Sequence, residues 1–358
     1  MSAAPAPIRV AVVGAGYWGP NLARNFKSCS DFQLTAICDL DLARAQRVAE
    51  PLGNIAAITS LHALLASDIE AIAIATPAQT HHGIAMEALR MGKHVLVEKP
   101  LADSVDKAGQ MVDEAALSSL VLMTDHTYCY TPAVAKIREL VIGGHLGDLL
   151  FIDCTRINLG LVQPDVDVFW DLAPHDLSIL DFILPGGLHP DSVSAHGADP
   201  LGTGKSCIGH LMMPLPNAVM AHVQVNWLSP TKIRQVVVGG SEKTLVWDDL
   251  NPQQRLSIYD RGVRLNEGAV VAGDAQRTAA QVSYRLGDTW SPALPEREAL
   301  ADMVREFAAA IRGRRRALTD GSAGLRVLSV LEAASRSLQN FGRMERLETS
   351  SHLLKGRL

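Results

Sequence analysis

The sequence predicts an α/β protein in two parts: a doubly wound parallel sheet over residues 1–125, and an α+β domain with a large open, mainly antiparallel sheet over residues 126–358. Three observations predict this class. Short apolar runs alternate with helical periodicity in the first part, and strand-like runs follow one another across short turns in the second. The length of 358 residues is also enough for two hydrophobic cores.

Runs rich in Val, Ile and Ala predict the strands of the first part, and amphipathic stretches between them predict its helices. Strands that are apolar at every position are typical of a parallel sheet covered by helices on both faces. The expected strands are 8–13, 33–38, 71–75, 94–97 and 121–124, and the expected helices are 18–27, 41–50, 79–91 and 103–116.

The pattern changes after an expected helix at 132–142. Turn-forming pairs such as Pro216-Asn217 and Gly239-Gly240 separate successive apolar runs, as in an antiparallel sheet with helices on one face. The expected strands are 149–155, 208–213, 219–227, 233–238, 244–247 and 256–259, and two helices are expected at 296–311 and 322–340.

Composition excludes several classes of protein. The chain has 33 Lys and Arg against 38 Asp and Glu, a formal net charge of −5, which argues against a nucleic-acid binder. No apolar run reaches the roughly 18 residues of a membrane span, and the N-terminus does not resemble a signal peptide, so we expect a cytoplasmic protein that does not bind membranes. The five cysteines form no C-x-x-C pair and the histidines form no H-x-x-x-H pair, so we expect no metal site.

A glycine-rich motif follows the first expected strand. Residues 14–19 (GAGYWG) match G-x-G-x-x-G, a weak signal alone, but here the motif opens a helix and Asp39 follows its last glycine by 20 residues. Gly14 would make the tight turn, and Gly16 would let the backbone approach a pyrophosphate. Gly19 would allow close strand–helix packing, with the phosphates at the helix N-terminus.

The same segment suggests which dinucleotide binds. We expect Tyr17 and Trp18 to contribute to the site and Asp39 to accept hydrogen bonds from the ribose hydroxyls. A carboxylate at this position would repel a 2′-phosphate, and the next cation, Arg44, lies five residues further on. The pattern therefore favours NAD over NADP as the cofactor.

Two further stretches follow strand ends, where open α/β sheets bind ligands. Thr76, Pro77 and His81 follow the third expected strand, and Glu98 and Lys99 follow the fourth. We expect all five residues at the cofactor site, with Lys99 near its nicotinamide end. Considered alone, a solvated surface lysine would be the better interpretation of Lys99.

The segment 169–178 (FWDLAPHDLS) carries a second candidate group. Asp171 and His175 are four residues apart, so on a helix they share one face, and a histidine held by a carboxylate is a common general acid/base arrangement. We expect Asp171 to be the N-cap of this helix and Pro174 to lie in its first turn. A capping aspartate beside a structural histidine explains the spacing equally well.

Together these residues resemble the Gfo/Idh/MocA oxidoreductases, the family of glucose–fructose oxidoreductase and inositol dehydrogenase. The similarity spans most of the chain, and the block that ends in EKP is highly specific, whereas GAGYWG alone is not. The resemblance implies a Rossmann domain followed by an α/β domain on a large open sheet. The matching segments are residues 14–19, 75–102 (ATPAQTHHGIAMEALRMGKHVLVEKPLA), 144–149 (GHLGDL), 170–178 (WDLAPHDLS) and 319–321 (TDG).

The resemblance also implies roles for three residues. Lys99 would hydrogen-bond the reacting hydroxyl and stabilise negative charge on its oxygen. His175 would be the general acid/base, with Asp171 as its partner, while the substrate carbon passes a hydride to the nicotinamide. The sequence matches the family at all three positions.

Some segments look most like family members that act on nucleotide-activated sugars, such as 3-dehydrogenase-like and 3-ketoreductase-like enzymes. These segments are residues 16–26, 156–160 and 169–184.

Four residues are candidate substrate contacts, each with a structural alternative. Arg156 and Asn158 could reach the substrate, or the arginine could be a surface residue or an intersheet ion pair. His126 and Tyr130 could line the same cleft or pack the hinge.

The main hypothesis is thus an NAD(P)-dependent oxidoreductase that interconverts a hydroxyl and a keto group on a sugar, with a nucleotide-activated sugar favoured. One alternative is a free cyclitol (inositol-type) or monosaccharide dehydrogenase. More distant alternatives are an NAD-dependent glycosidase and a non-catalytic dinucleotide-sensing regulator. An open sheet face is normally buried, so we expect a homodimer or homotetramer through the C-terminal sheet.

Overall fold

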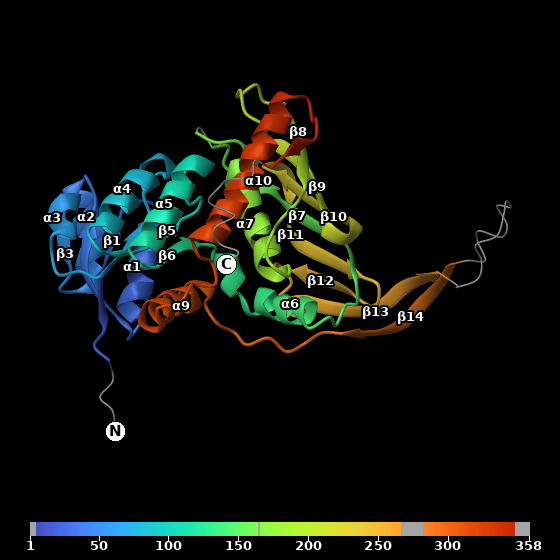
Figure 1. Ribbon diagram of the computed structural model, residues 1–358, viewed down its shortest axis with the longest axis horizontal. Coiled ribbons are helices and arrows are strands. Elements are labelled where there is room, and N and C mark those ends of the chain that lie inside the picture. The colour runs from blue at the N-terminus through green and yellow to red at the C-terminus, as the bar shows by residue number, and fades with distance from the viewer. Residues whose placement is uncertain (1–4, 164, 266–281, 348–358) are drawn as a thin grey trace. The chain divides into compact units, whose positions relative to one another are not determined.

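The computed structural model describes residues 5–163, 165–265 and 282–347, which form two compact units (Figure 1). The first unit comprises residues 5–131 and 296–332. The second comprises the described residues between 132 and 295, together with 333–347. This division differs from the expected single boundary near residue 125, which placed everything from 126 to 358 in the second domain. Residues 296–332 pack with the N-terminal unit instead.

A six-stranded sheet with only parallel pairing among its described strands forms the centre of the first unit. Its order is β3-β2-β1-β4-β5-β6, so the direction of strand addition reverses between β1 and β4. β1 and β4 are apolar at nearly every position because helices cover both faces of the sheet. The strands are β1 (Ile8–Val13), β2 (Phe32–Cys38), β3 (Ala56–Ile58), β4 (Ala71–Ile74), β5 (His94–Glu98) and β6 (Leu122–Asp125).

The helices of this unit connect the strands or return to them from the C-terminal part of the chain. Ser60 and Ser104 each begin a helix by accepting a backbone N–H with the side chain, as N-cap residues do. The helices are α1 (Gly19–Ser28), α2 (Leu42–Ala49), α3 (Leu61–Leu65), α4 (Ala78–Arg90), α5 (Val105–Leu117) and α9 (Ala299–Gly313), with α10 (Gly321–Gln339) up to Glu332 and the short 3-10 helices η1 (Glu50–Leu52) and η2 (Thr127–Tyr130).

An aromatic cluster explains why α9 belongs to the first unit. The ring of Phe32 on β2 lies 4.9 Å from that of Phe26 on α1, edge to face, and 5.9 Å from that of Phe307 on α9, stacked. Phe26 and Phe307 are fully buried, and α9 lies beside α1 (Figure 1). The apolar stripe of α9 therefore completes the core of the parallel-sheet unit.

A nine-stranded sheet forms most of the second unit, in the order β14-β13-β12-β11-β7-β10-β9-β8-β15. Its described pairs are antiparallel except β7 with β10, so the expectation of a mainly antiparallel sheet is confirmed. The strands are β7 (Leu149–Leu159), β8 (Ser192–Ala198), β9 (Ile208–Leu215), β10 (Val219–Asn226), β11 (Leu228–Gly240), β12 (Thr244–Asp248), β13 (Leu256–Leu265), β14 (Val282–Trp290) and β15 (Glu345–Arg346), with a 3-10 turn η3 (Pro216–Ala218) between β9 and β10.

The two faces of this sheet differ in burial. The helix α7 (Val168–Ile183) packs against β7, β9 and β10, and α6 (Pro132–Ile142) packs against α7. Ile152 and Cys154 on β7 are buried, whereas the alternate residue Phe151 is 37% exposed and Met212 on β9 is 40% exposed. The sheet therefore has one face covered by helices and one open face that carries apolar side chains.

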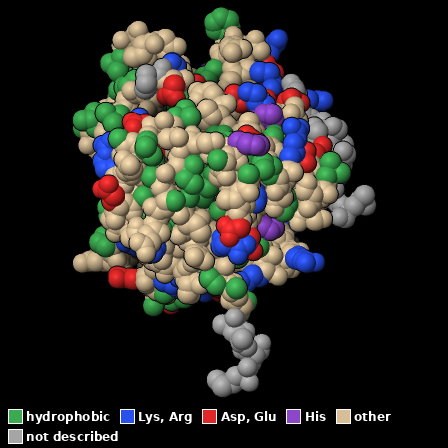
Figure 2. Space-filling model, turned by 90° about the vertical axis from the view of Figure 1, so that its left-hand side faces the viewer, with side chains coloured by type: hydrophobic (Ala, Val, Ile, Leu, Met, Phe, Trp, Pro, Cys, Tyr) green, Lys and Arg blue, Asp and Glu red, His purple; other side chains and the backbone are tan. Residues whose placement is uncertain are grey.

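The described residues contain no helix that is both long and apolar enough to cross a lipid bilayer. On the face shown in Figure 2, acidic and basic side chains are interspersed. This distribution agrees with the small net charge of the chain.

We expect Phe307→Ala to lower the free energy of unfolding by about 3–5 kcal/mol, because it removes a fully buried ring from the core beside β2. Urea unfolding monitored by circular dichroism measures this loss. Leu117→Ala, at an 84% exposed position, is the matched control and should stay within about 0.5 kcal/mol of the wild type. Equal effects of the two substitutions would contradict the placement of α9 in this core.

Candidate active site

The glycine-rich turn between β1 and α1 has the geometry of a phosphate-binding loop. Gly14 has φ +100°, and a Cβ there would lie 2.6 Å from the carbonyl oxygen of Ala75, after β4. A Cβ at Gly19 would lie 2.1 Å from the carbonyl oxygen of Gly14, whereas nothing lies within 4 Å of one at Gly16. The first and third glycines are thus required by close contacts, and the second leaves open space beside the backbone.

The start of α1 lies beside the glycine-rich turn. Trp18 is the N-cap residue and makes no capping hydrogen bond through its side chain. Pro20 has no N–H and the Asn21 N–H donates to the Trp18 carbonyl at 3.0 Å, so the attraction for an anion here comes from the positive end of the helix dipole. Tyr17 is 94% exposed, whereas the Trp18 indole Nε1 donates a hydrogen bond, 2.9 Å long, to Oδ2 of Asp125.

Asp39 at the end of β2 is tied to the glycine-rich turn. Its Oδ2 accepts the Ala15 N–H at 2.8 Å and its Oδ1 accepts the Asp41 N–H at 3.0 Å. Nη1 of Arg44 lies 3.6 Å from Oδ1 as well. The carboxylate keeps lone pairs for further donors, since two oxygens accept about four hydrogen bonds.

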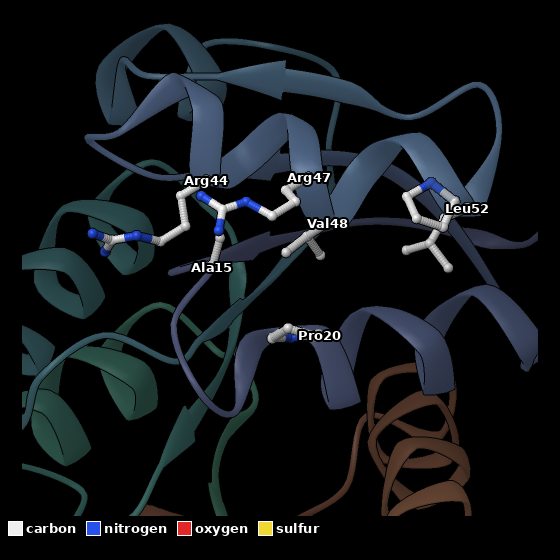
Figure 3. A pocket seen from close by; sticks show the side chains of 7 residues that line it. Ala15, Pro20, Arg44, Arg47, Val48 and Leu52 are labelled. Carbon is white, nitrogen blue, oxygen red and sulfur yellow. The ribbon is translucent and has the colours of Figure 1, made fainter.

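A pocket of about 400 Å³ is lined in part by Ala15 and Arg44, the two residues that contact the Asp39 carboxylate (Figure 3). In Figure 3, Arg44 and Arg47 project from α2 on one side of the pocket, and Pro20 of α1 lies on the other. Apolar walls with a cationic edge suit a purine base, which stacks on alkyl and guanidinium surfaces. Arg47 was not predicted as a site residue, although the helical periodicity of α2 places it near Arg44. The lining residues are Ala15, Pro20, Arg44, Arg47, Val48, Pro51 and Leu52.

His81 connects the ends of β4 and β5. Its ring nitrogens lie 2.8 Å from the carbonyl oxygens of Thr76 and Pro100, and the residue is 1% exposed. Burial lowers the pKa of His81, and the contacts with the two carbonyl oxygens oppose that effect, because only the protonated ring can donate to both. His81 therefore positions two segments. One is Thr76, which precedes the N-cap residue Pro77 of α4, and the other carries Lys99, where the Lys99–Pro100 peptide is cis.

The remaining candidates of the first unit lie beyond β6. Tyr130 is 8% exposed and its hydroxyl lies 2.9 Å from the Thr319 hydroxyl, which itself donates to the Thr124 carbonyl at 2.8 Å. Burial raises the pKa of Tyr130 well above its usual value. His126 is 3% exposed. These contacts match the packing alternative for Tyr130 more closely than a role at an open surface.

In the second unit, α7 begins earlier than expected. Its N-cap is Asp167, whose Oδ1 accepts the N–H groups of Phe169 and Trp170 at 3.0 Å each. The prediction that Asp171 is the N-cap was wrong: Asp171 lies in the first turn. Pro174 lies inside the helix instead of in its first turn, and it removes the N–H that would bond to the Trp170 carbonyl.

Asp171 and His175 are one helical turn apart on α7, as the spacing predicts. The Trp227 indole Nε1 donates to Oδ2 of Asp171 at 3.0 Å, and Trp227 is 1% exposed. This buried donor orients the carboxylate. Trp227 follows β10 in the sequence, and no local pattern links it to α7.

Arg156 on β7 is held by a buried ion pair. Its Nε and Nη2 donate to the two carboxylate oxygens of Asp176 at 2.9 and 2.8 Å, and both side chains are under 5% exposed. The pair joins β7 to α7, so Arg156 is a buried structural residue, but neither the surface residue nor the intersheet ion pair offered as alternatives. It fixes α7 beside His175 to the sheet. Asn158, two residues further along β7, is half-buried.

The described residues contain no group of three or more His, Cys, Asp or Glu side chains placed to hold a metal ion. The sequence-predicted residues thus gather in two places. In the first unit, the glycine-rich turn, Asp39, Thr76, Glu98 and Lys99 all lie at the carboxyl edge of the parallel sheet. In the second unit, Asp171 and His175 share one helix.

We expect Arg156→Met to lower the free energy of unfolding by about 3–5 kcal/mol, because it leaves the buried Asp176 carboxylate without its partner. The double variant Arg156→Met/Asp176→Leu should recover most of this loss in urea unfolding. Arg305→Met, which breaks an exposed pair with Asp302, is the control and should cost at most about 1 kcal/mol. A stable Arg156→Met protein with a raised KM would favour the substrate-binding alternative.

Comparison with known proteins agrees with this architecture. A family model described as "Oxidoreductase family, NAD-binding Rossmann fold" matches residues 8–126. The UDP-N-acetylglucosamine 3-dehydrogenase of Acidithiobacillus ferrooxidans is 30% identical over 90% of this chain and 94% of its own. Its solved structure superposes with a TM-score of 0.79 at 26% identity, over 94% of this chain and 99% of that one.

A second relative of similar coverage has another substrate in its name. The inositol 2-dehydrogenase of Rhizobium meliloti is 24% identical over 92% of this chain and 97% of its own. With the dinucleotide-binding geometry of the first unit and relatives matched along almost their whole length, the chain belongs to the Gfo/Idh/MocA family of oxidoreductases with an NAD-binding Rossmann fold.

Proposed function

We propose that this protein is an NAD-dependent oxidoreductase that interconverts a hydroxyl and a keto group on a nucleotide-activated sugar. The observation that carries the proposal is the nearly full-length similarity to a UDP-N-acetylglucosamine 3-dehydrogenase. The similarity to an inositol 2-dehydrogenase favours a free cyclitol as the second candidate substrate.

The proposed mechanism assigns one task to each polar group. Lys99 donates a hydrogen bond to the reacting oxygen and stabilises the charge that develops there. His175 takes the hydroxyl proton during oxidation and returns it during reduction, and Asp171, held by Trp227, favours the protonated imidazole. When bound, the nicotinamide supplies the hydride acceptor or donor.

The dinucleotide is held by groups of the first unit. The open space at Gly16 and the uncapped start of α1 suit the pyrophosphate, and the pocket with Arg44 and Arg47 suits the adenine. Asp39 disfavours a 2′-phosphate, and Arg44 is already engaged, with guanidinium nitrogens 3.6 Å from an Asp39 oxygen and 3.7 Å from an Asp41 oxygen. These contacts support NAD over NADP.

The open face of the nine-stranded sheet supports a homodimer or homotetramer. Phe151 and Met212 are partly exposed on this face, in neighbouring regions of β7 and β9. A second copy of the chain would remove these apolar side chains from water.

We expect Lys99→Ala and His175→Ala each to lower kcat by about 10²–10⁴-fold, because each removes a group that acts on the reacting oxygen or its proton. The assay is absorbance of the reduced nicotinamide with a panel of UDP- and TDP-sugars, inositols and free sugars. NAD affinity, measured by calorimetry, is the control and should remain close to wild type. Normal turnover in either variant would contradict the mechanism.

The panel also separates the alternatives. Turnover with free cyclitols alone would exclude the nucleotide-sugar proposal. Sugar cleavage without net change in the cofactor would indicate a glycosidase. Binding of NAD without turnover on any member of the panel would favour the dinucleotide-sensing regulator.

We expect Asp39→Ala to weaken NAD binding by roughly 10- to 150-fold, because it removes a charged acceptor of the ribose hydroxyls. Its preference for NAD over NADP should also fall, since the charge that repels a 2′-phosphate is lost. Asp68→Ala, at an exposed carboxylate, is the control for loss of one negative charge. An unchanged cofactor preference in Asp39→Ala would show that the cofactor assignment is wrong.

A further inference from the structure

Two carboxyl groups end neighbouring strands at the carboxyl edge of the parallel sheet. Glu98 is the last residue of β5, Asp125 is the last residue of β6, and their Cα atoms are register partners. Asp125 is 2% exposed. Glu98 belongs to the predicted cofactor site, whereas Asp125 lies outside every motif of the sequence.

The two carboxyl groups have different hydrogen-bond partners. Oδ2 of Asp125 accepts the Trp18 indole N–H at 2.9 Å, and its Oδ1 accepts the Thr127 hydroxyl. Oε2 of Glu98 is buried and has no hydrogen-bond partner among the described residues. The Glu98 carboxyl receives a backbone hydrogen bond from Lys99, whereas Asp125 has side-chain donors on both of its oxygens. Donors stabilise the ionised form of a carboxyl group, so the negative charge is favoured on Asp125.

The charges around the pair agree with this distribution. Burial, and then the charge of Asp125, raise the pKa of Glu98 well above its usual value. Burial also raises the pKa of Asp125, but the hydrogen bonds from Thr127 and Trp18 oppose that effect. The ammonium of Lys99 lowers the pKa of both groups. Burial raises both pKa values, but Asp125 has hydrogen-bond donors on both oxygens, so of the two groups Glu98 is the one that holds a proton more strongly.

Three segments each contribute one group that interacts with the two carboxyls. The glycine-rich turn contributes Trp18, β5 contributes Lys99, and the turn after β6 contributes Thr127. Lys99 is the charged group that acts on both carboxyls. An ionised Glu98 would therefore compete for the Lys99 ammonium, whereas a neutral Glu98 would not.

We propose that Asp125 is a positioning residue for the reaction: held by Trp18 and Thr127, it keeps a single negative charge beside Lys99 and holds the neighbouring Glu98 in its neutral acid form. Lys99 then faces one carboxylate charge from this pair instead of two. The connection to Lys99 rests on the proposed function, whereas the state of the carboxyl pair does not.

The first test compares pH profiles of kcat for the wild type, Asp125→Asn and Glu98→Gln. In Asp125→Asn, Glu98 loses its charged neighbour and ionises at lower pH, so the alkaline fall in kcat should move to lower pH by one unit or more. Glu98→Gln and the double variant should both lack this movement, since the titrating group is gone. Exposed Asp191→Asn is the matched control and should keep the wild-type profile.

The second test needs neither substrate nor cofactor. A group whose pKa is raised on folding stabilises the protein fully below its unfolded pKa, near 4.3 for Glu, and that stability is lost as pH rises through the folded pKa. The Tm of Glu98→Gln relative to wild type should therefore increase between pH 5 and pH 8, by roughly 3 °C or more. The same Glu98→Gln step in the Asp125→Asn background should give a smaller increase.

The outcomes separate this inference from the proposed function. If no sugar in the panel is turned over, the proposed function fails and the Tm comparison still decides the state of the carboxyl pair. If Asp125→Asn does not fold, the Glu98→Gln comparison with wild type remains. A Tm difference that does not grow with pH, or an alkaline limb that Asp125→Asn leaves unchanged, would overturn the inference.

Discussion

The turn at Gly14 is the constraint on which the dinucleotide site depends. Its positive φ and its contact with the Ala75 carbonyl bring the end of β1 against the end of β4, where the order of strands reverses. Two carboxylates then hold the turn from opposite sides: Asp39 through the Ala15 N–H and Asp125 through the Trp18 indole. A side chain at Gly14 would displace the turn from both, and with it the start of α1.

Periodicity predicts most of the fold, because apolar runs and amphipathic stretches record which residues are buried. Strands without a strong apolar pattern were missed. β3 has only three residues, and polar or small residues (Ser, His, Gly and Asp) interrupt the apolar pattern of β8 and β14. The division into units was also only partly predicted. The apolar stripe of α9 predicts that the helix packs against an apolar surface. The sequence does not say that this surface is formed by Phe32 and Phe26, because that contact depends on the tertiary structure.

Motifs with a fixed spacing identified the residues at strand ends, including Asp39, Glu98 and Lys99, because the parallel sheet places all its carboxyl ends at one edge. For three other candidates, Trp18, Asp171 and Arg156, the hydrogen-bond partners were not predicted. Asp125, Trp227 and Asp176 lie 107, 56 and 20 residues from the groups that they contact. No local pattern encodes such pairs, so sequence reasoning could name Arg156 and Asp171 but could not say what holds them. The early start of α7 was missed for a similar reason, since Asp167 and Asp171 are both acceptable caps until the backbone is known.

These long-range partners share one physical role. An acidic side chain at each position, Asp125, Asp171 or Asp176, receives a directed donor from a buried or half-buried group: the Trp18 indole, the Trp227 indole or the Arg156 guanidinium. A buried carboxylate without a donor costs several kcal/mol, so each donor fixes the position of its acid. Asp125 precedes His126, a candidate substrate contact, and Asp176 follows His175. Asp171 is one helical turn from His175. Each donor therefore fixes a charge next to a group that is proposed to act on the substrate, and the Arg156 donor contributes to the stability of the fold as well.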